Sequence, residues 1–178
     1  MEIEAKSQYT YQVIKEYQRF NLFKGKHYNK GYILFATLSI IALIIVTFGT
    51  LTFGLDYFTY YVFITLIFLN ILMAFLYFML PGITYKSNKN LQNIENKFVF
   101  SDDEITIASE NQGYKGNATM KYNLINKVYE TKKYIYIYIN RAQAYIIDKT
   151  QIDGGRIEEL RETITSRIPK KKYIICKD

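Results

Sequence analysis

The chain has 178 residues, 49% of them hydrophobic and 22% charged, and a formal net charge of +7. One cysteine, Cys176, excludes an internal disulfide, and with one histidine, His27, there is no His/Cys cluster at metal-ligand spacing. The average composition conceals two different parts of the chain. Residues 31–55 and 57–85 contain no charged residue, and Asp56 stands alone between them. A soluble protein with one uniform composition is therefore excluded.

Residues 1–30 carry two predicted elements. A short strand is expected within residues 3–11, and helical spacing of apolar residues predicts an amphipathic helix over about 10–24, with Lys15 and Arg19 off the apolar stripe. Two positions remain open for this helix. It lies in the headgroup plane of a membrane, or it packs on the C-terminal domain.

The two charge-free runs follow directly. The hydrocarbon core of a bilayer requires about 20 apolar residues in a helix. We therefore predict a transmembrane hairpin over residues 31–80, with one helix over about 31–55 and the other over about 58–80. Pro81-Gly82 is expected to end the second helix, since proline blocks continuation.

Basic residues flank the hairpin on both sides, and the turn between the helices has none. The positive-inside rule therefore predicts a multi-pass cell-membrane protein with both termini in the cytoplasm. Each basic residue near an anionic leaflet contributes about 1 kcal/mol to binding. The predicted lipid-interface residues are Lys24, Lys26, Lys30, Lys86, Lys89, Lys170, Lys171 and Lys172, with a solvated tail as the alternative for the last three.

Residues 86–178 are predicted to form a small domain. Alternating apolar and polar residues indicate short strands, and a helix is expected over 153–168, with Asp153 as N-cap and Pro169 beyond its end. Antiparallel strands closed by one amphipathic helix are typical of a small barrel or sandwich, a mostly-β or α+β class. The predicted strands cover residues 98–100, 104–108, 118–122, 125–130, 134–139 and 143–147.

One of these strands places Tyr134, Tyr136 and Tyr138 on the same face. A half-exposed tyrosine face would suit a protein partner, and ordinary strand packing is the alternative. Nucleic acid is not expected as a partner, because the chain carries no recognised nucleic-acid motif.

Four strings in this domain resemble the YcxB-like family of small bacterial membrane proteins. They are Phe98-Val-Phe-Ser-Asp-Asp-Glu-Ile105, Tyr122-Asn-Leu-Ile-Asn-Lys-Val-Tyr-Glu-Thr-Lys132, Tyr134-Ile-Tyr-Ile-Tyr138 and Gln143-Ala-Tyr-Ile-Ile-Asp-Lys149. The family usually has proline before the last lysine, where this chain has Asp148. The resemblance implies two membrane spans and a cytoplasmic domain similar to pleckstrin-homology (PH) folds, a bent antiparallel sheet capped by a C-terminal helix. It implies no activity.

The sequence offers no catalytic, cofactor or metal site. His27 is interpreted as a polar residue at headgroup level and Cys176 as an inert thiol, while Gly154-Gly155 lack a full phosphate-binding motif. The predicted spans contain no ionisable residue, which argues against transport. We expect a non-enzymatic membrane-anchored module whose domain binds a protein partner or anionic lipid, with a homo-oligomer also open. The alternative is an immunity protein against a membrane-active peptide such as a bacteriocin.

Overall fold

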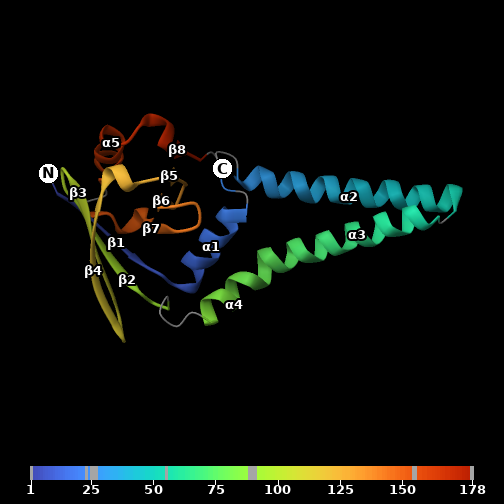
Figure 1. Cartoon of the computed structure of the whole chain (residues 1–178), viewed down its shortest axis with the longest axis horizontal. Helices are drawn as coiled ribbons and strands as arrows, with labels where there is room; N and C mark the ends of the chain where they lie inside the picture. The colour runs from blue at the N-terminus through green and yellow to red at the C-terminus, as the bar shows by residue number, and fades with distance from the viewer. Residues whose placement is uncertain are drawn as a thin grey trace.

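The computed structural model describes residues 2–22, 24, 28–54, 56–87, 92–153 and 156–176, without the side chains of residues 28–33, 53 and 58. A globular part contains all the strands, and two long antiparallel helices project from it (Figure 1). The projecting helices cover the two charge-free runs of the sequence, and the globular part contains the segments rich in charged residues.

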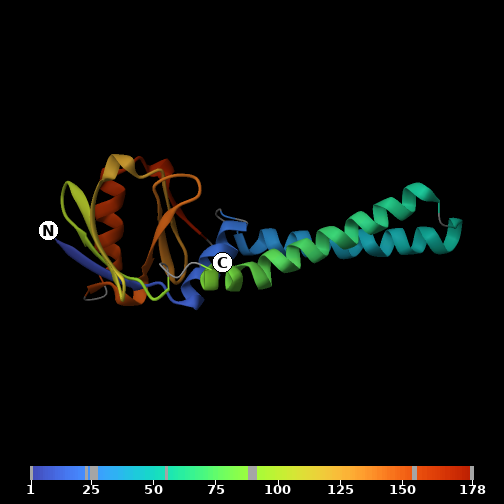
Figure 2. The ribbon, with the colours of Figure 1, turned by 60° about the horizontal axis from the view of Figure 1, so that its bottom comes forward.

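The projecting hairpin consists of α2, Tyr28–Phe53, and α3, Tyr57–Ala74. Between them Gly54 has a φ of +81°, a conformation that glycine adopts at no steric cost. The Asp56 side chain then accepts a hydrogen bond from the backbone amide of Thr59 at 2.8 Å and caps α3. The helices are long and apolar enough to cross a membrane, by length and composition, and they lie side by side (Figure 2).

The second helix does not end at Pro81-Gly82, so that prediction is wrong. It continues through a π-helical turn, η1 (Phe75–Met79), into α4 (Leu80–Ser87). Pro81 lacks the amide that would bond to the carbonyl of Tyr77, four residues earlier in an α-helix. The widened turn and a hydrogen bond of 3.4 Å from Arg19 Nε to the Tyr77 carbonyl accommodate the proline.

The globular part contains two four-stranded sheets. In the first, all neighbours are antiparallel in the order β1-β2-β3-β4. The hairpin separates β1 from β2 in sequence, yet these strands pair over their full length, so the N-terminal residues belong to the globular part. The four strands are Ile3–Gln8 (β1), Glu95–Phe100 (β2), Glu104–Asn111 (β3) and Tyr114–Lys121 (β4).

The second sheet has the order β7-β6-β5-β8, and β8 runs parallel to β5. Short 3-10 turns connect its strands to neighbouring elements: η3 (Tyr122–Leu124), η4 (Lys149–Gln151) and η6 (Lys170–Lys172). The tail after the last helix therefore contributes a strand. The four strands are Lys127–Glu130 (β5), Tyr134–Tyr138 (β6), Ala144–Asp148 (β7) and Tyr173–Ile175 (β8).

The last helix, α5 (Ile157–Arg167), lies between the two sheets (Figure 2). Its Leu160 and Ile164 are fully buried in the main core, with the inward side chains of both sheets. The prediction that Asp153 is the N-cap of this helix is wrong. Arg156 occupies that position and makes an ion pair of 3.3 Å with the Asp153 carboxylate.

A second core lies on the opposite face of the second sheet, where α1 (Tyr11–Leu22) covers the tyrosines. Tyr134, Tyr136 and Tyr138 are buried, with 6%, 2% and 2% exposed, so the prediction of a tyrosine surface for a partner is wrong. Phe20 of α1 stacks on Tyr136 with 4.7 Å between ring centroids. Of the two positions open to this helix, the structure shows the packed one.

Candidate functional site: a basic pocket at the base of the hairpin

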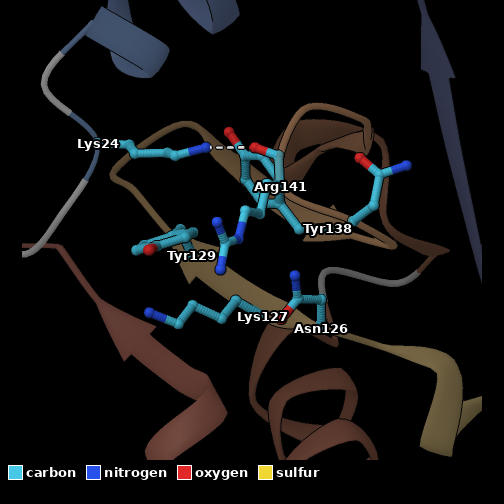
Figure 3. Close-up of a pocket in the computed structure, with 7 residues that line it drawn as sticks. Lys24, Asn126, Lys127, Tyr129, Tyr138 and Arg141 are labelled. Atoms are coloured by element: carbon cyan, nitrogen blue, oxygen red, sulfur yellow. Dashed lines mark hydrogen bonds between the residues drawn. The ribbon is translucent and has the colours of Figure 1, made fainter.

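A cavity of about 290 Å³ opens where the β6–β7 turn and the start of β5 meet Lys24 (Figure 3). Residues from three separate stretches of the chain form it. Its lining residues are Lys24, Asn126, Lys127, Tyr129, Tyr138, Asn140 and Arg141.

Lys24 connects the pocket to the hairpin. Its Nζ donates a hydrogen bond of 2.6 Å to the Arg141 carbonyl and lies 4.8 Å from the centroid of the Tyr138 ring. Because α2 begins at Tyr28, only four residues along the chain, this contact lies near the start of the first hairpin helix. The pocket is therefore held at the base of the hairpin.

The β6–β7 turn has a defined shape. The Asn140 side-chain oxygen accepts hydrogen bonds of 2.8 Å from the backbone amides of both Ala142 and Gln143, a local pattern that asparagine favours in turns. From α1, the Tyr17 hydroxyl donates to the Ala142 carbonyl at 3.0 Å. These bonds hold the turn that carries Arg141.

The basic side chains of the pocket have no acidic partner among the described residues. The guanidinium of Arg141 points into the space between the Tyr129 ring and the residues Asn126 and Lys127 (Figure 3). No lining residue is acidic, and neither Lys24, Lys127 nor Arg141 forms an ion pair in the part of the chain that the structure describes. Charge-assisted hydrogen bonds to an anion are the strongest interactions that such groups offer.

The aromatic wall of the pocket is rigid. The Tyr138 hydroxyl donates to the Asn21 side-chain oxygen at 2.5 Å, and burial raises the pKa of Tyr138, so this tyrosine is neutral. The Tyr129 ring packs edge-on against Tyr138 at 5.5 Å and against Phe20 at 5.3 Å.

The predicted lipid-interface lysines have different positions. Lys24 lines the pocket, and Lys86 is exposed near the end of α4. In the 3-10 turn η6 Lys170 and Lys171 are exposed, but Lys172 donates a hydrogen bond of 2.6 Å to the Ile125 carbonyl and is not a freely solvated tail residue. Lys30 lies in α2 with its side chain outside the description, and Lys26 and Lys89, like His27 and Gly154-Gly155, lie outside the described residues.

Sequence reasoning missed Lys127 and Arg141 as site residues. Arg141 follows Asn140 in a predicted turn, and Lys127 is one of many lysines in strands. Nothing local distinguishes them, because they meet Lys24 only in the folded chain, where Lys24 and Arg141 are separated by 117 positions.

A second cluster of charges surrounds the buried carboxylate of Glu130. Glu130 of β5 accepts hydrogen bonds from Lys149 at 2.8 Å, from Arg161 at 2.7 and 2.9 Å, and from the Tyr173 hydroxyl at 2.7 Å. Its acceptors are occupied by donors from η4, α5 and β8, which gives it a structural role. Over the described residues, no group of three His, Cys, Asp or Glu side chains is placed to hold a metal ion.

These features define a class: a small domain of two sheets and a C-terminal helix, interrupted by an apolar two-helix hairpin and carrying a basic pocket at its base. Residues 100–164 match the family model described as YcxB-like protein, and the chain is similar to this family over that region. The match confirms the family resemblance, and it runs from the end of β2 into α5. Comparison with curated proteins and with solved structures gave no match.

Proposed function

We propose that this protein is a bacterial membrane-anchored module that binds an anionic lipid headgroup. The hairpin spans the cell membrane with both termini in the cytoplasm, and the domain, which we infer to be PH-like, holds the headgroup in the basic pocket. The observation that carries this proposal is the group of three cations at the base of the hairpin, Lys24, Lys127 and Arg141, which have no acidic partner among the described residues. Two sheets with a C-terminal helix support the PH-like assignment.

The exposed surface of the hairpin supports the membrane anchor. Its two apolar segments, Leu34–Thr52 and Thr59–Ser87, are almost entirely unburied within the protein. Large side chains such as Ile45 and Phe48 are 64% and 67% exposed. Soluble monomers rarely expose so large a continuous apolar surface, whereas a bilayer covers it.

The depth of the pocket agrees with a headgroup as ligand. The apolar segment begins at Leu34, and residues 28–33 of α2 span about 9 Å at 1.5 Å per residue. The headgroup region of one leaflet is roughly 5–8 Å thick. With Leu34–Thr52 in the hydrocarbon core, the start of α2 lies at the outer edge of the headgroups, four residues along the chain from Lys24.

Cysteine labelling in intact cells tests the topology. On a Cys176→Ser background, Tyr57→Cys places a thiol at the hairpin tip, where Tyr57 is 87% exposed, and Lys86→Cys places one at the base. A membrane-impermeant maleimide should label the tip variant in intact cells and the base variant only after lysis. Labelling of the base variant in intact cells overturns the topology.

Native mass spectrometry of the full chain in mild detergent tests the binding. Anionic phosphatidylglycerol should be retained over phosphatidylcholine, and the double variant Lys127→Gln/Arg141→Gln should lose about 30-fold in retention, since each cation contributes about 1 kcal/mol. Lys115→Gln is the matched control, because Lys115 is an exposed lysine of β4, paired with Glu110. Equal losses in double variant and control would contradict a specific pocket.

A further inference from the structure

We propose that the pocket recognises a terminal phosphate monoester in preference to a phosphodiester. This inference rests on the proposed function and names the chemical class of the group that the pocket holds. It follows from the number of cations around the cavity, from the donors they present and from the walls of the cavity.

The charge of the pocket exceeds what a phosphodiester neutralises. Lys24, Lys127 and Arg141 bring three positive charges to one cavity, and none of its described lining residues is acidic. A phosphodiester carries one negative charge, whereas a phosphate monoester carries about −1.5 to −2 near neutral pH. A monoester therefore leaves about one positive charge of the pocket uncompensated, and a diester leaves two.

The donors also match three terminal oxygens. The Arg141 guanidinium presents a planar fork that binds two phosphate oxygens side by side. The Asn126 amide nitrogen points toward the same space, and Lys127 extends along the edge of the cavity with its amine turned away from the guanidinium (Figure 3). A monoester offers three unsubstituted oxygens to these donors, whereas a diester offers two and places an ester substituent at the third position.

Two buried aromatic rings close one side of the cavity. Tyr129 and Tyr138 are 6% and 2% exposed, and their rings are fixed against each other and against α1. On the remaining side Lys24 crosses the cavity to bond with the Arg141 carbonyl (Figure 3). A compact terminal phosphate needs one way out for its single ester bond, and a diester needs two.

The test compares two lipids and a soluble monoester on the full chain by native mass spectrometry in mild detergent. At equal concentration, phosphatidic acid should be retained about tenfold more than phosphatidylglycerol. This preference should vanish in Arg141→Gln and in Lys127→Gln, two exposed side chains whose replacement leaves the core intact. Lys115→Gln, the matched control, should keep it.

The outcomes separate this inference from the proposed function. Equal retention of both lipids, lost in Arg141→Gln, overturns the monoester inference and leaves lipid binding in place. A preference for phosphatidic acid that persists in Arg141→Gln overturns the inference as well. Displacement of phosphatidic acid by an equal concentration of glycerol 3-phosphate supports the monoester chemistry but overturns a lipid as its source. Absence of all adducts overturns both proposals.

Discussion

Replacement of Glu130 by glutamine gives a sharp test of how the second sheet is held to the last helix. Glu130 joins β5 to Lys149, to Arg161 of α5 and to Tyr173 of β8, and its side chain is only 3% exposed. Glu130→Gln keeps the shape of the side chain but removes the charge that both cations face. Two positive groups are then left near each other with no anion between them.

The cost of this change follows from the pKa of the carboxyl. Burial raises the pKa of Glu130, but the hydrogen bonds from Arg161, Lys149 and Tyr173 outweigh burial and lower the pKa from 4.5 to about 2. This difference corresponds to about 3 kcal/mol of unfolding free energy, in the range found when one partner of a buried ion pair is removed. Because the folded pKa lies below the unfolded one, the contribution is complete above pH 4.5 and is lost as the pH falls towards 2.

Thermal unfolding of the full chain in mild detergent, followed by tyrosine near-UV circular dichroism, measures the effect. At pH 7 Glu130→Gln should lower the Tm by roughly 6–12 °C, and the gap to the wild type should narrow below pH 4.5. The control is Glu110→Gln, since the Glu110 side chain is 64% exposed in its pair with Lys115 and contributes less than about 1 kcal/mol. A gap between Glu130→Gln and wild type that stays constant from pH 7 to pH 3 would refute the reasoning.

Three further variants probe the packing of the second core and the hairpin. Phe20→Ala removes a ring that is 1% exposed and should cost about 3–5 kcal/mol of unfolding free energy, with faster hydrogen exchange throughout α1; a loss below 1 kcal/mol would contradict its central position. Arg19→Met removes the guanidinium that lies 4.0 Å from the Tyr77 ring centroid, and exchange should accelerate in η1 while the sheets stay protected. Tyr9→Phe leaves the Ile146 amide without the hydroxyl that accepts its 3.0 Å hydrogen bond, which should cost about 1–3 kcal/mol and expose that amide to exchange.

The charge-free runs and the alternation of apolar and polar residues were enough to predict the hairpin and most strands. The helices expected over 31–55 and 58–80 correspond to α2 and to the continuous run from α3 to α4, because long charge-free runs need no tertiary information. The end of the second helix could not be predicted. The expectation that proline ends a helix considers only the hydrogen bonds within that helix. Here Arg19 of α1 donates to the Tyr77 carbonyl, which Pro81 leaves without its α-helical donor.

The faces of β6 were predictable, but their surroundings were not. Alternation correctly separates Ile135 and Ile137 from the tyrosines of the same strand. What covers the tyrosines is α1, which precedes the hairpin in sequence and returns to the domain only because β1 pairs with β2. The pocket depends on the same long-range return, since Lys24 follows α1 directly and reaches Arg141 across 117 positions. No local pattern contains that information.

Insertion of the hairpin between two paired strands fixes how the domain sits on it. Gln8 of β1 lies opposite Glu95 of β2, so the chain leaves and re-enters the same sheet at neighbouring positions. On the way out α1 packs against α4, where Tyr11 meets Tyr85 with 5.8 Å between ring centroids. A domain on a single flexible linker samples many depths, and each binding event must then fix its orientation at an entropic cost. Here two connections and one packed helix set the orientation of the domain on the hairpin in advance.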